Sequence, residues 1–543
     1  MPPTRASAPR RKAAPFRLTY ATMFDPPEAL HTRFERALAR ARSRTGRQYG
    51  MLIGGAETFC EAKVDDRSPI NTDWLLGVFQ EGGRAEADAA LSAAQAAFAG
   101  WAGLPWRARV RALRRVAAEI ERRVYEIAAV LSLEVGKNRM EALGDAQEAA
   151  DLIRYACGQM EANAGYVKPM GRDPLPGYRA TNISALRPHG VWLVVSPFNF
   201  PVALSAGPAA AALLAGNTVV LKPATDTPWS ARLLAECFRD AGLPAGAFNF
   251  VTGPGGTLGR ALVEDPRVDG ITFTGSYDVG MGILQRMAAG PWPRPCIAEM
   301  GGKNAVIVSR KADLDAAALG IVRSAYGLQG QKCSACSRVF VERPVKARLV
   351  ARLRERIQAI PVGDPTRRET WMGPVINRTA HRHFGEYADE FFREGRVIAG
   401  GRFLTEGLHA KGYFCEPTLV EGVPLDHPLW QEEMFVPIAM LAAVDSLEEA
   451  VGLANSATFG LTAGFYGSKE EAAWFFDRIQ VGVAYANRPH GATTGAWPGF
   501  QPFGGWKCSG SSGKNSGGLH YLPLYMREQI RTLVERKRGE PRA

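Results

Sequence analysis

The feature that most constrains the fold is an alternation of short apolar strands and helices that begins near Ala185. The segments GVWLVVSPFNFP, VVLKPA, FNFVTG and GITFTGS are rich in β-branched or aromatic residues and are punctuated by Gly, Pro or Ser. Such alternation predicts a parallel sheet with both faces covered by helices. Ligands bind these sheets beyond the carboxyl ends of the strands, where the polar punctuation falls.

The same pattern restarts after Gly302, which predicts a second α/β domain that extends to about residue 485. Its first units are the strand NAVIV, a helix over 313–327, the strand RVFVE and a helix over 345–358. Upstream, apolar residues at helical spacing predict helices. These cover 26–47, 84–101, 106–133 with a break near Arg123, and 138–158, and MLIGG at 51–55 is a strand and turn.

Composition excludes several classes of protein. The net charge of +12 lies almost entirely in the ends: residues 1–50 carry +8 and residues 527–543 carry +3. A nucleic-acid-binding protein is expected to carry its basic patch on a folded face, whereas here the positive charge lies at the two ends of the chain. Nucleic-acid binding is therefore a weak hypothesis. The longest apolar run, Val202–Leu221, contains Pro208, Gly216 and Asn217. It therefore predicts a buried helix that leads into a strand rather than a membrane span.

The cysteines and the N-terminus bear on the compartment. Eight scattered cysteines in 543 residues indicate a reducing environment, and hence a cytoplasmic protein. Residues 1–14 are rich in Pro, Ala and Arg, which predicts a disordered tail. The same composition leaves an organellar transit peptide open.

Cys333 is the strongest candidate for a reactive group. It lies in GQKCSACSR, among small and polar residues, after a Gly-Leu-Gln-Gly segment that does not sustain a helix. We expect an exposed nucleophile whose pKa is lowered by positive charge or a helix N-terminus. Cys333 and Cys336 also form a CxxC pair, which leaves a redox disulfide or half of a zinc site as alternatives. Since no second CxxC is present, we expect no metal.

Glu299 is the candidate base. It precedes two glycines in EMGGK, and these allow the backbone to approach a cleft closely. A covalent thioester needs activated water for its release, and a partly buried Glu suits that task. Taken alone, a Glu before two glycines is only a turn.

The usual dinucleotide fingerprint GxGxxG follows none of the expected strands. Two other turns could hold a phosphate at a helix N-terminus, GPGGTLG at 253–259 and FTGS at 273–276. Lys222, at the end of TVVLK, could reach ribose hydroxyls or a phosphate, although a lone Lys more often faces solvent.

Together these segments resemble the aldehyde dehydrogenase superfamily from about residue 50 to 530. The matching segments are SPFNFP at 196–201, LKPATDTP at 221–228, FTGS, EMGGK, GQKCSACSR, QEEMFVP at 431–437 and QPFGGWKCSG at 501–510. The resemblance implies two α/β domains with parallel-type sheets and a small β oligomerisation flap. The implied boundaries are 15–168 with 190–300 for the dinucleotide-binding domain, 301–485 for the catalytic domain, and 169–189 with 486–543 for the flap and C-terminal segment.

The resemblance also implies the chemistry. Cys333 is the nucleophile, Glu299 the general base, and Asn199 the donor to the oxyanion, helped by the Cys333 N–H. Lys222 and Glu433 hold the riboses of NAD, with NADP not excluded, Ser276 lies near the pyrophosphate, and Phe435 near the nicotinamide. The implied cofactor site further includes Ser196, Phe198, Thr225, Gly253, Gly256, Phe273, Thr274 and Gly275.

Within the superfamily, the chain is most similar to the 1-pyrroline-5-carboxylate (glutamate γ-semialdehyde) dehydrogenases. That similarity implies oxidation of glutamate γ-semialdehyde to glutamate in proline catabolism. Ser334, Gly495 and Ala496 would bind the substrate carboxylate and Glu148 its amino group. Phe200 and Phe503 complete the implied substrate site.

Two departures from the family pattern leave alternatives open. Val436 stands where a Gly is expected after EEMF, and Thr225 supplies no acid to repel a 2′-phosphate. The loop from Asn487 to Gly495 is a few residues longer than in some members, which leaves the aldehyde chain length open. The alternatives are another amino-acid semialdehyde or small aldehyde as substrate, and an inactive structural relative. We also expect a homo-oligomer in which the flap pairs with the C-terminal stretch of another subunit.

Overall fold

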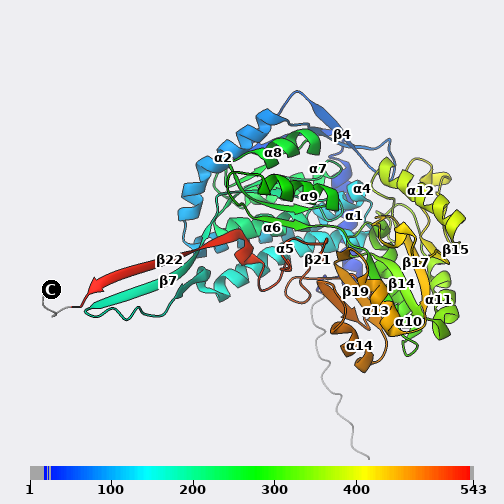
Figure 1. The fold of residues 1–543 in the computed structure, drawn as a ribbon. Helices are drawn as coiled ribbons and strands as arrows, with labels where there is room; N and C mark the ends of the chain where they lie inside the picture. Colours follow the sequence, from blue (N-terminus) through cyan, green and yellow to red (C-terminus); the bar gives the residue numbers. More distant parts are fainter. Residues whose placement is uncertain (1–16, 21, 24–25, 538–543) are drawn as a thin grey trace, which may run out of the picture.

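The structure is a computed structural model, and it describes residues 17–20, 22–23 and 26–537. The tail predicted over residues 1–14 lies outside these described residues. Two seven-stranded sheets form the two lobes in Figure 1, and a long β ribbon projects from one of them. This arrangement confirms the predicted α/β architecture.

The first sheet is mostly parallel and carries the predicted alternation of strands and helices. Its order is β12 (Cys296–Glu299), β11 (Val268–Thr274), β8 (Val191–Val195), β9 (Thr218–Lys222), β10 (Phe248–Phe250), β2 (Met51–Ile53) and β3 (Ala56–Thr58). Both faces are buried because successive side chains point to opposite sides. Val191 and Leu193 join the core on one face, whereas Trp192 and Val194 join the core on the other.

Helices cover both faces of this sheet. One core includes α2 (Arg84–Gly103), α8 (Arg260–Glu264) and α9 (Tyr277–Ala288). The other includes α1 (Glu28–Arg42), α3 (Trp106–Arg122), α4 (Val124–Val135), α5 (Arg139–Ala162), α6 (Ala203–Ala215) and α7 (Pro228–Asp240). The apolar run from Val202 is the buried helix α6 followed by β9, as predicted, and Gly216 ends the helix with a left-handed φ of 104°.

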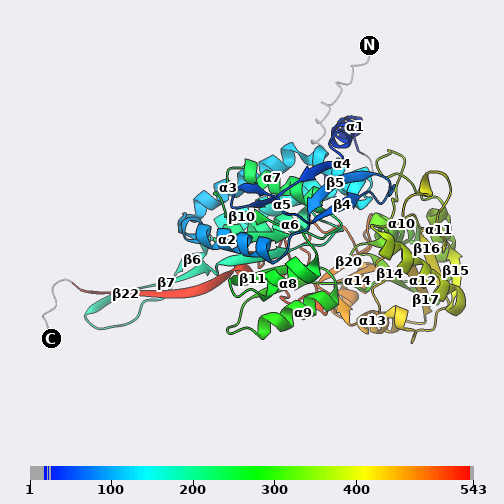
Figure 2. The same ribbon diagram turned by 90° about the horizontal axis from the view of Figure 1, so that it is seen from above.

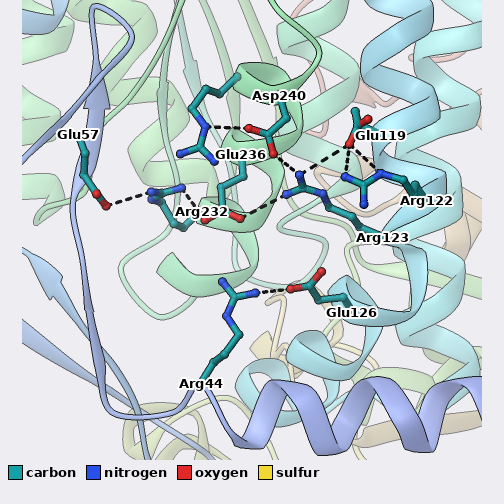
Figure 3. A network of polar contacts seen from close by, with 10 residues as sticks. Arg44, Glu57, Glu119, Arg122, Arg123, Glu126, Arg232, Glu236 and Asp240 are labelled. Atoms are coloured by element: carbon teal, nitrogen blue, oxygen red, sulfur yellow. Dashed lines mark hydrogen bonds and ion pairs between the residues drawn. The ribbon is translucent and has the colours of Figure 1, made fainter.

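The predicted break near Arg123 is present between α3 and α4. Figure 3 shows the Arg123 guanidinium reaching α7, where it contacts Asp240 and lies 3.3 Å from Glu236. On the other side of Glu236, Arg232 links α7 to Glu57 of β3. The network therefore joins the α3–α4 junction to the helix beside the first sheet.

The second sheet also has seven strands and is covered by helices on both faces. Its order is β15 (Arg396–Ala399), β16 (Thr418–Glu421), β17 (Ile438–Val444), β14 (Cys336–Glu342), β13 (Asn304–Val308), β19 (Thr462–Tyr466) and β20 (Val483–Ala486). Along β13, Ala305 and Ile307 face one core, and Val306 and Val308 face the other. The covering helices are α10 (Leu314–Tyr326) and α11 (Lys346–Gln358) on one face, and α12 (Arg378–Glu394), α13 (Leu447–Asn455) and α14 (Lys469–Phe476) on the other.

Three smaller sheets complete the described part of the chain. One joins β1 (Arg47–Tyr49), β5 (Leu75–Gln80) and β4 (Lys63–Arg67), and a second joins β18 (Phe459–Gly460) to β21 (Trp506–Lys507). The third is the predicted flap, in which β7 (Tyr178–Pro188) lies between β6 (Val167–Pro169) and β22 (Met526–Arg536).

The flap corrects one prediction. We expected it to pair with the C-terminal stretch of another subunit, but β7 pairs with β22 of its own chain over eleven residues. Figures 1 and 2 both show this ribbon extending away from the two lobes. It carries apolar side chains that are more than half exposed, Ile530 and Leu533. This ribbon is thus an exposed part of the described structure.

The buried helix α6 agrees with a separate finding: in the described part of the chain, no helix is long and apolar enough to cross a membrane.

Candidate active site

Cys333 lies on a strained turn between the end of α10 and the start of β14. Leu328 and Gln329 adopt left-handed backbone conformations, with φ of 51° and 55°. Residues other than Gly rarely adopt such angles, and they cluster at functional sites. A side chain at Gly302 would place its Cβ 2.3 Å from the Cys333 carbonyl oxygen, so this glycine permits the close packing of EMGGK against the turn.

Asn304 fixes the turn from the adjacent strand. Its Nδ2 donates to the carbonyl oxygens of Cys333 at 2.6 Å and Ala335 at 2.9 Å. Its Oδ1 accepts from the Thr462 N–H at 3.0 Å, which orients the amide. The backbone that carries Cys333 is therefore held by a buried side chain whose own position is set by the second sheet.

The environment of the Cys333 thiol corrects a second prediction. We expected positive charge or a helix N-terminus to lower its pKa. Instead, burial raises the pKa well above its usual value, and the carboxylates of Glu433 and Glu299 raise it further. The N–H groups of Cys333 and Ser334 favour the thiolate and offset this only in part. The surroundings of the half-buried Cys333 therefore favour its thiol form over the thiolate.

The other half of the CxxC pair is a core residue. Cys336 is 1% exposed, begins β14 and packs against the second core, with its Sγ 3.7 Å from the Arg338 carbonyl oxygen. Both cysteines are free thiols. Among the described residues, no cluster of His, Cys, Asp and Glu could hold a metal ion.

Glu299 ends β12 and points into the same region. Its Oε2 is buried and has no hydrogen-bond partner among the described residues. Burial raises its pKa well above the usual value, and the Gly505 N–H offsets this in part. Once it is ionised, a carboxylate with a raised pKa is a stronger base toward water than an ordinary one.

Asn199 is hydrogen-bonded to the turn that carries Cys333. Its Nδ2 donates to the Gln331 carbonyl oxygen at 2.9 Å, and its Oδ1 accepts from the Phe200 N–H at 3.1 Å. A carboxamide has two N–H donors. One of them is used by Gln331, and the second can serve an oxyanion that forms beside Cys333.

A single cavity of about 470 Å³ joins most of the predicted catalytic and substrate residues. Its lining includes Cys333, Glu299, Glu148, Phe200, Ser334, Gly495, Ala496, Phe503 and Thr274. We call Cys333 and Glu299, which line the cavity, and Asn199, which donates to the neighbouring Gln331 carbonyl, the reaction end of the site. We call Tyr20, Glu148, Gly495, Ala496 and Trp497 the recognition end. Residues from both lobes and from the loop after β20 thus meet in one space.

Helix α5 supplies the acidic wall of this cavity. Glu141, Asp145 and Glu148 recur at helical spacing and therefore share a face. Asp145 accepts from the buried Lys137 ammonium at 2.8 Å and from the Ala203 N–H at 2.8 Å. The same ammonium lies 3.8 Å from the centre of the Phe200 ring, so it fixes one wall of the cavity by a cation–π contact.

Several predicted cofactor residues lie close to the turn that carries Cys333. The rings of Phe198 and Phe435 contact edge to face at 5.8 Å, and Phe435 has a left-handed φ of 55°. Glu433 Oε1 accepts from the Gly302 N–H at 2.8 Å, and burial raises its pKa to about 7. Glu433 and Phe435 therefore lie close to the turn that carries Cys333, where they line a small pocket with Gly302 and Lys332.

The dinucleotide side of the first sheet has groups that fit a phosphate and a ribose. Lys222 is buried rather than facing solvent, and its ammonium donates to the Pro223 carbonyl at 2.8 Å. Ser276 precedes α9 and makes no side-chain capping bond within the part of the chain that the structure describes, which leaves that helix N-terminus for an anion. A Cβ at Gly256 would meet no described atom within 4 Å, so that turn is open to a ligand.

Three of the predicted cofactor residues have structural roles of their own. Phe273 is 4% exposed and packs in the core of the first lobe, and a Cβ at Gly275 would lie 2.5 Å from its ring. Ser196 Oγ accepts from Ser205 Oγ at 2.7 Å. Gly253 is required by packing, since a Cβ there would lie 2.5 Å from the Gly82 carbonyl oxygen. Thr225 is exposed.

The fold and this site define a family. The chain belongs to the aldehyde dehydrogenase family, whose model matches residues 58–530. It is 38% identical over 513 residues to the 1-pyrroline-5-carboxylate dehydrogenase of Geobacillus sp. (strain WCH70), covering 94% of this chain and 97% of that one.

Solved structures agree with this assignment. The crystal structure of 1-pyrroline-5-carboxylate dehydrogenase from Thermus with bound NAD superposes with a TM-score of 0.89 at 36% identity and covers 97% of this chain and 100% of that one. Proline utilization A from Bdellovibrio bacteriovorus has a TM-score of 0.89 at 34% identity and covers 95% of this chain and 53% of that one.

Sequence reasoning missed four residues that shape the site. They are Tyr20, Lys137, Asp145 and Asn304. Asn304 directly follows EMGGK, and the sequence pattern there predicts only the start of a strand. Lys137 and Asp145 are eight residues apart on either side of a helix start, and a buried ion pair at that spacing leaves no pattern in a single sequence.

Proposed function

We propose that this protein oxidises glutamate γ-semialdehyde to glutamate with NAD as the hydride acceptor, in the breakdown of proline. The observation that carries the proposal is the single cavity in which Cys333 and Glu299 lie together with Glu148, Ser334, Gly495 and Ala496. The semialdehyde has an aldehyde at one end and an α-amino acid at the other. Its cyclic form, 1-pyrroline-5-carboxylate, arises when the amine condenses with the aldehyde and loses water.

Recognition of the amino-acid end needs complementary groups at fixed positions. Ser334 and the backbone N–H groups of Gly495 and Ala496 would donate to the substrate carboxylate. The Glu148 carboxylate would pair with the α-ammonium, and Phe200 and Phe503 would pack against the carbon chain. Because both charges are matched, a plain aliphatic aldehyde would bind less tightly.

Catalysis would begin when the Cys333 thiol loses its proton and its sulfur adds to the aldehyde carbon, forming a thiohemiacetal. Asn199 and the Cys333 N–H would stabilise the oxyanion. Bound NAD would supply the acceptor for the hydride that leaves this carbon, and the oxyanion would collapse to a thioester on Cys333. Glu299 would then take a proton from water, whose oxygen attacks the thioester and releases glutamate and the thiol.

The proposed NAD site uses Lys222, Glu433, Ser276 and Phe435. The relative from Thermus was solved with bound NAD, which supports this choice. Thr225 supplies no negative charge to repel a 2′-phosphate, so NADP would also be accepted. Replacing Thr225 by Glu would then lower kcat/KM for NADP by about tenfold through charge repulsion, with little change for NAD.

We further propose that the protein is a homo-oligomer of the cytoplasm. The projecting ribbon of β7 and β22, with Ile530 and Leu533 exposed, offers a surface for another copy. Eight free cysteines and bacterial relatives support a reducing compartment. Sedimentation of the full chain and of Leu533→Glu would test the assembly.

The function is tested by steady-state rates with a panel of aldehydes, each with NAD and with NADP. We expect kcat/KM for glutamate γ-semialdehyde to exceed that for its six-carbon homologue. A preference for a plain aliphatic aldehyde would refute the proposal, whereas a preference for the six-carbon homologue would assign the protein to another amino-acid semialdehyde.

A further inference from the structure

The segment that precedes α1 places a tyrosine inside the substrate cavity. The Tyr20 hydroxyl donates to Glu148 Oε2 at 2.8 Å. Its ring contacts Trp497 and Phe200 edge to face, with centroids 5.3 Å and 6.2 Å apart. All three of these partners line the cavity.

Helix α5 has a recess for this ring. Gly144 lies one turn before Glu148, and a Cβ at Gly144 would lie 2.5 Å from Tyr20 Cε1. Any other residue at this position would therefore displace the tyrosine. A glycine within a helix lowers helix stability relative to alanine. Its presence at position 144 is explained by the Tyr20 ring, which occupies the space that a side chain would need.

A second set of contacts attaches the same segment to the loop after β20. The Arg17 guanidinium lies 3.3 Å from Asp151 Oδ2 and 5.1 Å from the centre of the Phe500 ring. Trp497 Nε1 donates to the same Asp151 oxygen at 3.0 Å. Asp151 thus connects the N-terminal segment to the loop that carries Gly495 and Ala496.

We propose that Tyr20 is a positioning residue for substrate recognition: its hydroxyl holds the Glu148 carboxylate in the orientation that receives the α-ammonium of the aldehyde. This inference rests on the proposed function. The hydrogen bond occupies Oε2 and leaves Oε1 for the substrate. Tyr20 acts through Glu148 and has no part in the chemistry at Cys333.

The electrostatics of the recognition end give this hydrogen bond a measurable consequence. Burial raises the pKa of Glu148 to about 8, and the bond from Tyr20 and the charge of Lys137 oppose that rise. The titratable groups that face Glu148 are Tyr20, Lys137, Asp145, Asp151 and Tyr485. Since only the carboxylate pairs with an ammonium, binding of the amino aldehyde is lost as pH falls through this pKa.

The test is Tyr20→Phe, which removes the hydroxyl and keeps the ring. Two aldehydes are compared, glutamate γ-semialdehyde and glutarate semialdehyde, which differ only in the α-amino group. We expect the ratio of kcat/KM between them to fall about tenfold in the variant, mainly through KM for the amino aldehyde. The acidic limb of kcat/KM for the amino aldehyde should also move to higher pH, because the carboxylate has lost a donor.

Three further variants separate this role from a general structural one. Tyr49→Phe removes another tyrosine hydroxyl, which donates to the Arg44 carbonyl far from the cavity, and should leave the ratio unchanged. Gly144→Ala should lower the ratio as Tyr20→Phe does, and it decides the question should Tyr20→Phe not fold. In a Glu148→Gln background, Tyr20→Phe should have little additional effect on the ratio.

The possible outcomes distinguish the two proposals. An unchanged ratio in Tyr20→Phe, or an equal loss with both aldehydes, would overturn the role of Tyr20, while a wild-type preference for the amino aldehyde would leave the proposed function standing. A wild-type enzyme with no such preference would overturn both.

Discussion

The reaction end and the recognition end of the cavity differ in how far their polar groups are already paired. At the reaction end, Glu299 Oε2 is buried and has no hydrogen-bond partner among the described residues, and burial together with the carboxylates of Glu433 and Glu299 raises the pKa of the Cys333 thiol. At the recognition end, Glu148 accepts from Tyr20, and the adjacent Asp145 accepts from both Lys137 and Ala203. In the proposed mechanism, Glu299 is thus left for a partner that forms during the reaction, whereas Glu148, which would select the substrate, is positioned in advance.

The largest effect on activity is expected for Cys333→Ala, which tests the reaction end of the cavity. With no sulfur to form the thiohemiacetal, we expect NAD reduction to fall by at least about 10⁴-fold with every aldehyde. Cys336→Ala is the matched control, because Cys336 packs in the core of the same motif, and it should retain most of its activity. Retained NAD reduction in Cys333→Ala would contradict the assignment of the nucleophile.

Glu299→Gln should separate the two halves of the reaction. We expect thioester hydrolysis to slow by about 10²–10⁴-fold because water loses its proton acceptor. Hydride transfer precedes that step, so rapid-mixing experiments should still show a burst of NADH. A variant that lost the burst and kept the steady-state rate would assign Glu299 to a different step.

Asn199→Ala should lower kcat by about 10²–10³-fold through loss of an oxyanion donor. The loss should be similar for glutamate γ-semialdehyde and for glutarate semialdehyde, since both pass through the same oxyanion. If the loss depended on the α-amino group, Asn199 would belong to the recognition end, and the contrast between the two ends would fail.

At the recognition end the effect should be smaller and selective. Glu148→Gln removes the charge that pairs with the ammonium, so KM for glutamate γ-semialdehyde should rise by about 10–100-fold. KM for glutarate semialdehyde should change little, and steady-state kinetics with both aldehydes would measure this. Equal changes with the two substrates would show that Glu148 only supports the fold.

The smallest expected effect concerns the thiol before cofactor binds. Because burial and two carboxylates raise the pKa of Cys333, its thiolate fraction at pH 7.5 is below that of a free thiol. Alkylation by iodoacetamide, followed by mass spectrometry of the Cys333 peptide, should be about tenfold slower than that of glutathione at pH 7.5 and should rise beyond pH 9. Faster alkylation than glutathione at pH 7.5 would show an activated thiolate.

The sequence predicted the sheets and their covering helices well because those elements repeat simple patterns. Trp192 and Val194 alternate with Val191 and Leu193, and the break at Arg123 interrupts a clear helical stripe. Cys333 and Glu299 were candidates from their own segments, the resemblance to a family supplied Glu148, and the fold places all three in one cavity.

Properties that depend on burial or on distant contacts were beyond the sequence. The sequence predicts a lowered pKa for Cys333, but the pKa is raised by desolvation of the thiol and by the nearby carboxylates of Glu433 and Glu299. Tyr20 was overlooked because its partner Glu148 lies 128 residues away and the segment around it carries no helical or strand pattern. The partner of the C-terminal strand was assigned to another subunit, although a strand of the same chain lies within reach.

The wall of the cavity runs in sequence from Tyr20 to Tyr521, so nearly the entire polypeptide has to be in place before the chamber closes. A nascent chain that stops before Gly495 would already contain Cys333, Glu299 and Glu148, but it would lack the backbone of Gly495 and Ala496 and the Trp497 ring that complete the cavity wall. The chamber is therefore finished only late in synthesis, by residues close to the end of the chain.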